Sequence, residues 1–303
     1  MSADIRVDQE LASRLVHTQF PELDPIQVEP LGEGCDSVAF EVNGGWVFRF
    51  PKRPDVERQL LIETKLLRSL TVRGSPIPLP AYSFHGRPSA EFPLHFAGYS
   101  KLPGTTANRV DPAKPVHRRL APALGRFLSW LHAFSATDAM AMGVPDQRGH
   151  DVVGDVQKEA LEDFPVLARV APDAPLDAWR AFLLAAPMPA PVSAFSLVHN
   201  DLAAEHVLVD APTQGVTGVI DWSDAAIGDR AIDFAGIFHW GGAPFLDDVL
   251  ANYDRPIDAH LAARARFFAA GRGVLDVQFG LERNDREYVE GGLRALRLAC
   301  GAD

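Results

Sequence analysis

Three things are scarce in this chain of 303 residues: cysteine, long apolar stretches and positive charge. The two cysteines, Cys35 and Cys300, leave no disulfide framework, which fits the reducing cytoplasm. No apolar run approaches the roughly 20 residues that a membrane helix needs. The first residues also lack the basic and apolar regions of an export signal. We therefore expect a cytoplasmic protein that does not insert into a membrane.

The acidic balance limits the choice of partner. The chain has 40 acidic and 29 basic residues, a formal net charge of −11. This charge argues against binding to nucleic acid and mildly favours a cationic small ligand. The contents of 47% apolar and 23% charged residues are typical of globular proteins. The length is sufficient for two medium lobes or one large domain.

The periodicity of apolar residues changes along the chain. Residues 28–50 alternate as paired strands do, with a glycine-containing turn between them. Apolar residues then recur at helical spacing over 62–70 and again over 124–131. Residues 101–104, which contain Pro and Gly, indicate a connector between lobes. Residues 258–300 alternate as amphipathic helices do. The pattern predicts strands first and helices afterwards.

A glycine-containing motif lies within the first pair of strands. Gly32, Gly34 and Ser37 occur where the chain turns, and glycine lets the backbone aim its N–H groups at phosphate oxygens. An ordinary turn is the alternative. A P-loop is excluded because no Gly-Lys-Ser or Gly-Lys-Thr follows. A dinucleotide fingerprint is excluded because the motif leads into a strand and not a helix.

A cation and a carboxylate follow this motif. Phosphoryl transfer from a nucleotide needs a cation at the phosphates, and in kinases a helix carboxylate pairs with it. Strand alternation places Arg49 opposite Phe48, and Glu63 lies inside an apolar helical repeat where a carboxylate needs a partner. The alternative is a salt bridge for Glu63 and a surface position at the strand end for Arg49. Lys52 is an alternative phosphate ligand, and arginine is not an equal replacement for the usual lysine.

The segment from 197 to 221 carries the most chemistry. Asp201 directly follows an apolar strand, where a carboxylate can orient an acceptor hydroxyl and take its proton. We expect His199 to point back into the lobe and bind the loop backbone. A second apolar run ends in Asp221, which with His206 would hold magnesium ions. Each residue alone is compatible with a buried polar or turn role, but the set in this order favours catalysis.

The chain resembles the aminoglycoside phosphotransferase family, and the 2″-phosphotransferases most closely. That branch combines a His-Asn-Asp catalytic start with histidine where most kinases have asparagine at the metal position. The resemblance covers about residues 28–235, with a fainter similarity over 279–284. Its motifs are Gly32-Glu33-Gly34, Phe48 to Lys52, Phe96 to Tyr99, Leu124 to His132, His199-Asn200-Asp201, His206, Ile220-Asp221 and Asp224 to Asp229.

The resemblance implies an α+β, protein-kinase-like fold with two lobes. The small N-lobe, residues 1–98, would hold a β-sheet and one main helix and bind the nucleotide. Residues 99–104 would form the hinge, and the mostly helical C-lobe, residues 105–303, would hold the catalytic groups and the antibiotic. We expect a monomer that uses Mg²⁺ and either ATP or GTP.

The resemblance also implies roles for individual residues. Asp201 would be the base or orienting residue, and His206 and Asp221 the metal ligands. The expected nucleotide-binding residues are Gly32, Gly34, Ser37, Arg49, Lys52, Glu63, Tyr99, Ser100 and Leu102. The expected substrate-binding residues are Glu205, Asp224, Trp240 and Glu282. Asp247, Asp248, Asp276 and Asp285 are further acidic candidates.

Two departures from the family pattern keep alternatives open. Arg49 stands where lysine is expected. The segment after Asp233 is apolar and aromatic where the aminoglycoside enzymes tend to place carboxylates, and Trp240 could stack on a sugar or an apolar ligand. Macrolide phosphotransferases share the histidine at the metal position, so a macrolide or a small metabolite is the alternative acceptor. A non-catalytic nucleotide-binding module is a third hypothesis, which the presence of Asp201, His206 and Asp221 together disfavours.

Overall fold

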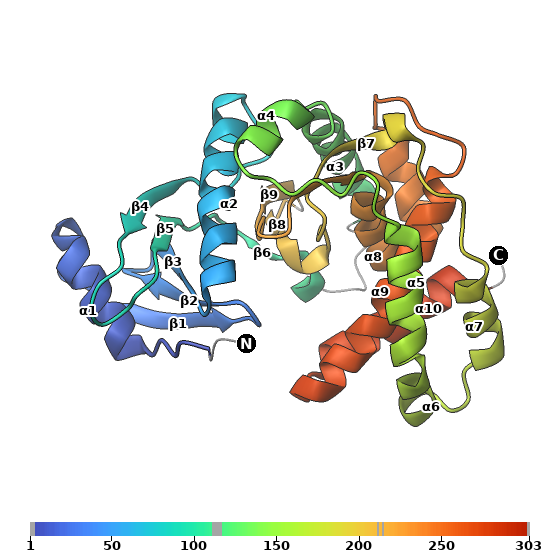
Figure 1. Ribbon diagram of the computed structural model, residues 1–303, viewed down its shortest axis with the longest axis horizontal. Helices are drawn as coiled ribbons and strands as arrows, with labels where there is room; N and C mark the ends of the chain where they lie inside the picture. The colour runs from blue at the N-terminus through green and yellow to red at the C-terminus, as the bar shows by residue number, and fades with distance from the viewer. Residues whose placement is uncertain (1–3, 111–116, 211, 214, 302–303) are drawn as a thin grey trace.

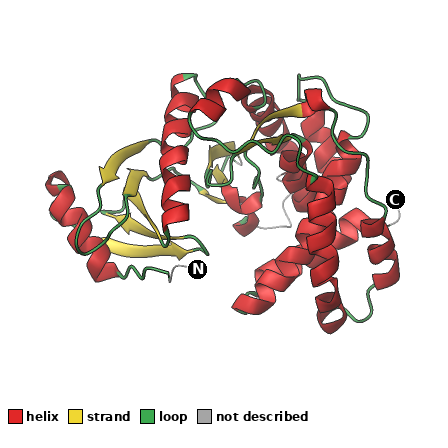
Figure 2. Ribbon diagram, viewed as in Figure 1, coloured by secondary structure: helices red, strands yellow, loops and turns green. Residues whose placement is uncertain are grey.

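The chain folds into two lobes that differ in secondary structure (Figure 1). The structure is a computed structural model that describes residues 4–110, 117–210, 212–213 and 215–301. The longer strands form one sheet in the N-terminal lobe, while helices dominate the C-terminal lobe (Figure 2). The predicted α+β, protein-kinase-like fold is confirmed.

The N-terminal lobe is built on an antiparallel sheet of five strands in the order β1-β2-β3-β5-β4. Its strands are β1 (Val28–Glu33), β2 (Ser37–Val42), β3 (Trp46–Pro51), β4 (Tyr82–Gly86) and β5 (Phe96–Ser100). The predicted hairpin is β2–β3, in which Val42 pairs with Trp46. Its turn places Asn43 at φ 53° and Gly44 at φ 68°, the left-handed conformation that Asn and Gly tolerate best.

Two helices cover this sheet from different sides. Helix α1 (Gln9–Gln19) packs with Phe48 and Phe50 in an apolar cluster of the N-lobe. Helix α2 (Pro54–Val72) carries the predicted apolar repeat and contacts β3, β4 and β5. Because strand residues alternate between faces, Arg49 projects away from the Phe48–Phe50 cluster. This alternation is what directs Arg49 towards α2.

The C-terminal lobe combines two small sheets with a larger number of helices. Strand β7 (Phe195–Val198) pairs with β10 (Ala226–Asp229), and β8 (Val207–Asp210) lies between β6 (Thr105–Thr106) and β9 (Gly215–Val219). The α-helices are α3 (His117–Leu131), α4 (Ala136–Ala141), α5 (Val152–Asp163), α6 (Leu167–Val170), α7 (Leu176–Leu184), α8 (Ala231–Leu250), α9 (Leu261–Arg283) and α10 (Arg286–Cys300). Short 3₁₀ turns cover Pro21–Leu23, Ala107–Arg109, Phe164–Val166, Val192–Ala194 and Ala204–His206.

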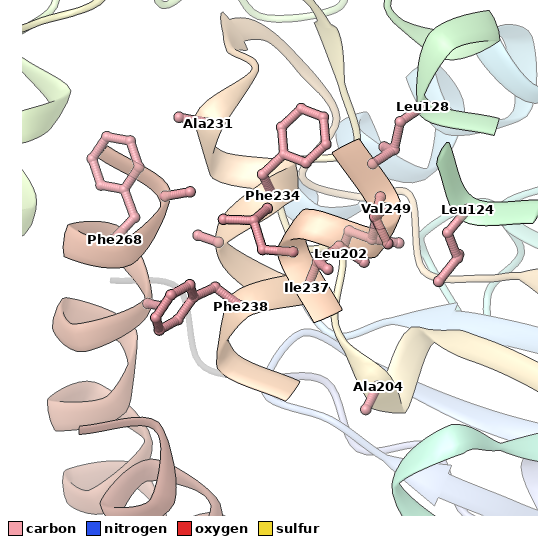
Figure 3. Packing of buried hydrophobic residues seen from close by; sticks show 14 of the residues in the cluster. Leu124, Leu128, Leu202, Ala204, Ala231, Phe234, Ile237, Phe238, Val249 and Phe268 are labelled. Atoms are coloured by element: carbon pink, nitrogen blue, oxygen red, sulfur yellow. The ribbon is translucent and has the colours of Figure 1, made fainter. Parts of the chain in front are cut away.

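The core of this lobe lies directly beneath the loop after β7. Leu202 of that loop is buried among side chains of α3 and α8, including Leu128, Phe234 and Ile237 (Figure 3). Gly236 of α8 approaches the loop so closely that an added Cβ would overlap the carbonyl oxygen of Leu202. The loop that carries Asp201 is therefore seated on a close-packed surface.

No helix in the described part of the chain combines the length and the apolar character needed to cross a membrane.

Candidate active site

A single cavity of about 570 Å³ joins the two lobes. One end is apolar and receives Leu31, Val47 and Tyr99, next to the connector after β5. The other end is lined by acidic and aromatic side chains of the C-lobe: Glu205, Trp240, Asp276, Asp285, Glu287, Tyr288 and Glu290. The cavity thus has apolar side chains of the N-lobe and connector on one side, and on the other a C-lobe lining in which carboxylates outnumber the cations Arg109 and Arg294.

Arg49 lies at the centre of a network that links the lobes. Its Nη1 donates to both carboxylate oxygens of Glu63 at 2.9 Å, and Tyr82 Oη donates to Glu63 Oε1 at 3.0 Å. Its Nη2 donates to Asp221 Oδ1 at 3.2 Å and to Ser223 Oγ at 2.9 Å. Burial raises the pKa of the Glu63 carboxyl, and the charge of Arg49 opposes that rise. The structure therefore brings Arg49 and Glu63 together, as their spacing predicted.

Lys52 occupies a different place. Its Nζ donates to Glu33 Oε1 at 2.7 Å and to the carbonyl oxygen of Gly34 at 2.8 Å, so it faces the glycine-containing turn. Both Gly32 and Gly34 are exposed there, and Gly34 N–H donates to the carbonyl oxygen of Ser37 at 3.0 Å. In this arrangement Lys52 stabilises the turn, and Arg49 is the cation beside Asp221.

A buried carboxylate holds the loop that contains Asp201. Asp233 of α8 accepts the backbone N–H groups of His199 at 3.1 Å and of Asn200 at 2.9 Å. Its Oδ2 also lies 3.1 Å from His132 Nε2. Asn200 has φ 71°, a conformation that costs energy in most residues and is common at functional sites. The backbone of the loop is thereby fixed just before Asp201.

His199 is a structural partner of the same loop. Its Nε2 lies 3.0 Å from the carbonyl oxygen of Ile220, and its Nδ1 accepts the N–H of Asp201 at 3.3 Å. Each ring nitrogen thus has a backbone partner, as a neutral imidazole allows. Burial lowers the pKa of His199 and keeps the ring neutral. The prediction that His199 binds the loop backbone is confirmed.

His206 and Asp221 face each other beside Asp201. His206 Nδ1 lies 2.7 Å from the carbonyl oxygen of Asp201, so Nδ1 carries the hydrogen and Nε2 presents its lone pair. That Nε2 is 3.8 Å from Asp221 Oδ2. Burial favours the neutral form of Asp221, but the charge of Arg49 outweighs it, together with a hydrogen bond from Ser223 Oγ, and holds its pKa at about 2. The ionised carboxylate of Asp221 and Nε2 of His206 therefore lie close enough together to contact the same bound ion.

These two groups fit a partial ligand set for a magnesium ion. Within the described ranges no three His, Cys, Asp or Glu side chains are grouped closely enough to hold a metal by themselves. Magnesium in phosphoryl-transfer sites is bound by one or two carboxylates, with substrate phosphates and water completing the shell. Asp221 agrees with that mode, and His206 beside it would add a nitrogen ligand, which magnesium prefers less than oxygen.

The remaining candidates are divided between the cavity and the surface. Tyr99 and Leu102 line the apolar end, whereas Ser100 is exposed and pairs with Trp46 across the sheet. Glu205 and Trp240 line the acidic end. Asp224 is solvent exposed and does not line the cavity; partial desolvation, with the charges of Asp201 and Asp221, raises its pKa to about 6. Glu282 is exposed, accepts a hydrogen bond from Gln278 at 2.6 Å and also lies outside the cavity lining.

The structure adds residues that sequence reasoning missed. Arg272 of α9 donates from Nη1 to Asp201 Oδ1 at 2.7 Å and from Nη2 to Glu205 Oε1 at 2.8 Å. Tyr288 lines the acidic end, and its pKa is raised to about 12 by burial and by the charges of Glu205 and Asp276. No motif marks these residues, because they come from helices far along the chain whose pattern is that of any amphipathic helix.

The sequence model of the phosphotransferase enzyme family APH matches residues 27–267, and this chain belongs to that family. The protein is accordingly a phosphotransferase with an alcohol group as acceptor. The resemblance to the aminoglycoside phosphotransferases is confirmed.

Solved structures of similar fold include antibiotic kinases of two kinds. The GDP and kanamycin complex of APH(2″)-IIIa is 29% identical, with a TM-score of 0.73 and coverage of 95% of this chain and 97% of that chain. The GDP complex of wild-type aminoglycoside 2′-phosphotransferase-IIIa is 29% identical, with a TM-score of 0.74 and coverages of 97% and 98%. The macrolide 2′-phosphotransferase MphH from Brachybacterium faecium is 25% identical, with a TM-score of 0.62 and coverages of 95% and 97%.

Proposed function

We propose that this enzyme transfers the γ-phosphate of ATP or GTP to a hydroxyl group of an aminoglycoside antibiotic. The observation that carries the proposal is the position of Asp201. Its carboxylate lies beside the His206–Asp221 pair and next to the acidic end of the cavity. A hydroxyl bound there would meet both a proton acceptor and the phosphate held at Arg49.

The reaction follows from these positions. Asp201 orients the acceptor hydroxyl and accepts its proton while the acceptor oxygen forms a bond to the γ-phosphorus. The bond between that phosphorus and the β-phosphate oxygen breaks, and the nucleoside diphosphate leaves. Arg49, already held by Glu63, donates to phosphate oxygens in place of the usual lysine. When bound, Mg²⁺ would neutralise phosphate charge, and His206 and Asp221 would hold it.

The two ends of the cavity match the two substrates. The apolar slot with Leu31, Val47 and Tyr99 suits a purine ring, and Leu102 lies on the connector beside it. Gly32, Gly34 and Ser37 form the exposed turn above the phosphates in this arrangement. At the other end, carboxylates can replace the water around the ammonium groups of an aminoglycoside. The GDP and kanamycin bound by APH(2″)-IIIa provide a precedent for both substrate types.

A macrolide is the second candidate acceptor. Trp240 and Tyr288 give the acidic end two aromatic surfaces, which suit an apolar ring system better than a highly charged one. The similarity to MphH supports this candidate as well.

The division of the chain follows the same proposal. Residues 1–98 would bind the nucleotide, 99–104 would form the hinge and 105–303 would bind the acceptor. In support, β5 of the N-lobe sheet ends at Ser100 and β6 of the C-lobe begins at Thr105. One chain supplies every candidate group, which supports a monomer. Nucleotide substrates and the two free cysteines support a cytoplasmic enzyme.

Mass spectrometry of an antibiotic panel tests the proposal. The enzyme is incubated with Mg²⁺, with ATP or GTP, and with aminoglycosides and macrolides in separate reactions. We expect an aminoglycoside to gain the mass of one phosphate group, and the D201N variant to give at least about a hundredfold less product in the same time. Product with macrolides alone would establish the second candidate. Absence of product from every antibiotic would refute both.

A further inference from the structure

Arg272 is bound to the same carboxylates that a cationic acceptor would need. In addition to its bonds to Asp201 and Glu205, its Nε lies 3.9 Å from Asp276 Oδ2. Glu205 and Asp276 both line the acceptor end of the cavity. One guanidinium is therefore paired with Asp201 and Glu205 and lies near Asp276, whose Oδ2 is closer to His239 Nε2, at 2.8 Å.

Both carboxylate oxygens of Asp201 already have partners, which affects how an acceptor can bind. Oδ1 accepts a hydrogen bond from Arg272, and Oδ2 lies 3.4 Å from His206 Nδ1. An acceptor hydroxyl has to approach this carboxylate closely in order to lose its proton. An ammonium group beside that hydroxyl would compete with Arg272 for the carboxylate oxygens of Asp201. The two cations would also repel each other if both stayed at this carboxylate.

The packing of α9 fixes where Arg272 projects. Its two neighbours in sequence are glycines. An added Cβ on Gly271 would overlap the side chain of Val156 in α5, and one on Gly273 would lie 2.9 Å from the carbonyl oxygen of Gly292 in α10. The helix is thus held closely on two sides, and it cannot rotate to remove Arg272 from the loop. Displacement of the guanidinium requires a change of its own side-chain rotamer.

We infer that Arg272 determines acceptor specificity: it is ion-paired with Asp201 and Glu205, so an ammonium group of a polycationic acceptor binds these two carboxylates only by displacing it. This inference rests on the proposed function. It implies that, among aminoglycosides, the enzyme favours those with few positive charges near the reacting hydroxyl.

A purely structural salt bridge makes a different prediction. If Arg272 served only to hold the loop after β7, its loss would weaken every acceptor by a similar factor. If it competes with acceptor cations, its loss must favour the polycation selectively. The ratio of two affinities therefore separates the explanations.

The test compares binding of kanamycin and of a macrolide with a single amino group, measured by isothermal titration without nucleotide. Arg272→Met removes the charge but keeps most of the side chain, and Arg272→Gln is a second neutral variant in case the first does not fold. Arg272→Lys keeps the charge. Arg180→Met, on the exposed face of α7, is the matched control.

We expect the neutral variants to bind kanamycin more tightly by about tenfold or more, and the macrolide by less than about twofold. Arg272→Lys and Arg180→Met should resemble the wild type. Equal changes for both ligands, or unchanged or weaker kanamycin binding, would overturn the inference. If the wild type phosphorylates neither compound, the proposed function fails, yet the ratio of affinities still decides the role of Arg272.

Discussion

Two ion pairs, one in each lobe, show how differently the two ends of the site are built. Arg49 and Glu63 have side-chain exposures of 13% and 1%, whereas Arg272 and Asp201 have 23% and 32%. Breaking a buried pair leaves an uncompensated charge, which costs roughly 3–5 kcal/mol. Exposed pairs contribute about 0–1 kcal/mol. The half-buried Arg272–Asp201 pair lies between these limits, so we expect its loss to cost less stability than the loss of the Arg49–Glu63 pair.

The largest effect is expected at Asp201. D201N removes the proton acceptor, so kcat should fall by about 10²–10⁴. Nucleotide affinity should stay within about twofold of wild type, because Asp201 lies on the acceptor side of the phosphates. Steady-state kinetics and nucleotide titration measure the two quantities. Turnover at the wild-type rate would remove Asp201 from the mechanism.

The next largest effect concerns stability. E63Q removes the carboxylate that accepts both bonds from Arg49 Nη1 and leaves only Asp221 beside the buried guanidinium, so the free energy of unfolding should drop by about 2–3 kcal/mol. Urea denaturation measures this difference. The control is E33Q, which removes the exposed partner of Lys52 and should cost less than about 1 kcal/mol. Equal losses in the two variants would contradict the contrast between the buried and the exposed pair.

The choice between Arg49 and Lys52 can be made by nucleotide affinity. R49A removes the cation that reaches Asp221 and Ser223, so nucleotide binding should weaken about tenfold or more. K52A removes a side chain that binds Glu33 and the turn, and should change affinity less than about threefold. Titration of both variants with ATP and GTP measures the difference. The reverse order would assign the phosphates to Lys52.

A smaller effect follows from two histidines beneath the catalytic loop. Burial lowers the pKa of His132 and of His199, so the folded protein resists protonating them. As the pH falls through about 6.5, these histidines become protonated in the unfolded chain but stay neutral in the folded chain. Stability should therefore decrease below that pH, by at most about 1.4 kcal/mol per histidine per pH unit. The pKa of Asp221 is lowered in the folded protein, so protonation of Asp221 reduces the free energy of unfolding only under more acidic conditions.

Urea unfolding at pH 7.5 and pH 5.5 measures this dependence. Replacement of His132 by Asn should make the decrease shallower than in wild type. A higher free energy of unfolding at pH 5.5 than at pH 7.5 would show that other groups control the pH dependence of stability.

The smallest effect is expected at Glu282. Its side chain is exposed and bonded to Gln278, and it lies outside the cavity lining. E282Q should therefore leave KM for the acceptor within about twofold of wild type. E205Q, inside the cavity, provides the comparison and should change KM more. A larger effect from E282Q would extend the acceptor site beyond the cavity.

Local patterns were sufficient to predict the donor end and the catalytic loop. Strand alternation placed Arg49 opposite Phe48, and helical spacing placed Glu63 on the inner face of α2. The apolar runs before Asp201 and Asp221 are β7 and β9, which end beside each other. Each of these predictions depends on neighbouring residues and on one period, 2.0 or 3.6.

The acceptor end could not be predicted in the same way. Arg272 reaches Asp201 across 71 residues, through the packing of α9 against α5, α8 and α10. Only the tertiary arrangement decides which polar face of that helix meets the loop. Asp276 and Glu282 illustrate this, because six residues turn a helix by about 240° and place the two carboxylates on different faces. Both residues were acidic candidates in the sequence, and no local pattern shows which of the two lines the cavity.

The continuity of the cavity has a consequence for inhibitor design. A single chamber runs from Leu31 and Tyr99 at one end to Asp276 and Tyr288 at the other. A molecule that tethers a purine-like ring to a weakly basic aromatic group could occupy both ends at once. Its second contact would form at a high effective concentration, so modest fragments could combine into a tight ligand. A series of such compounds would also measure the distance between the two substrate sites, because affinity is highest when the tether length matches that distance.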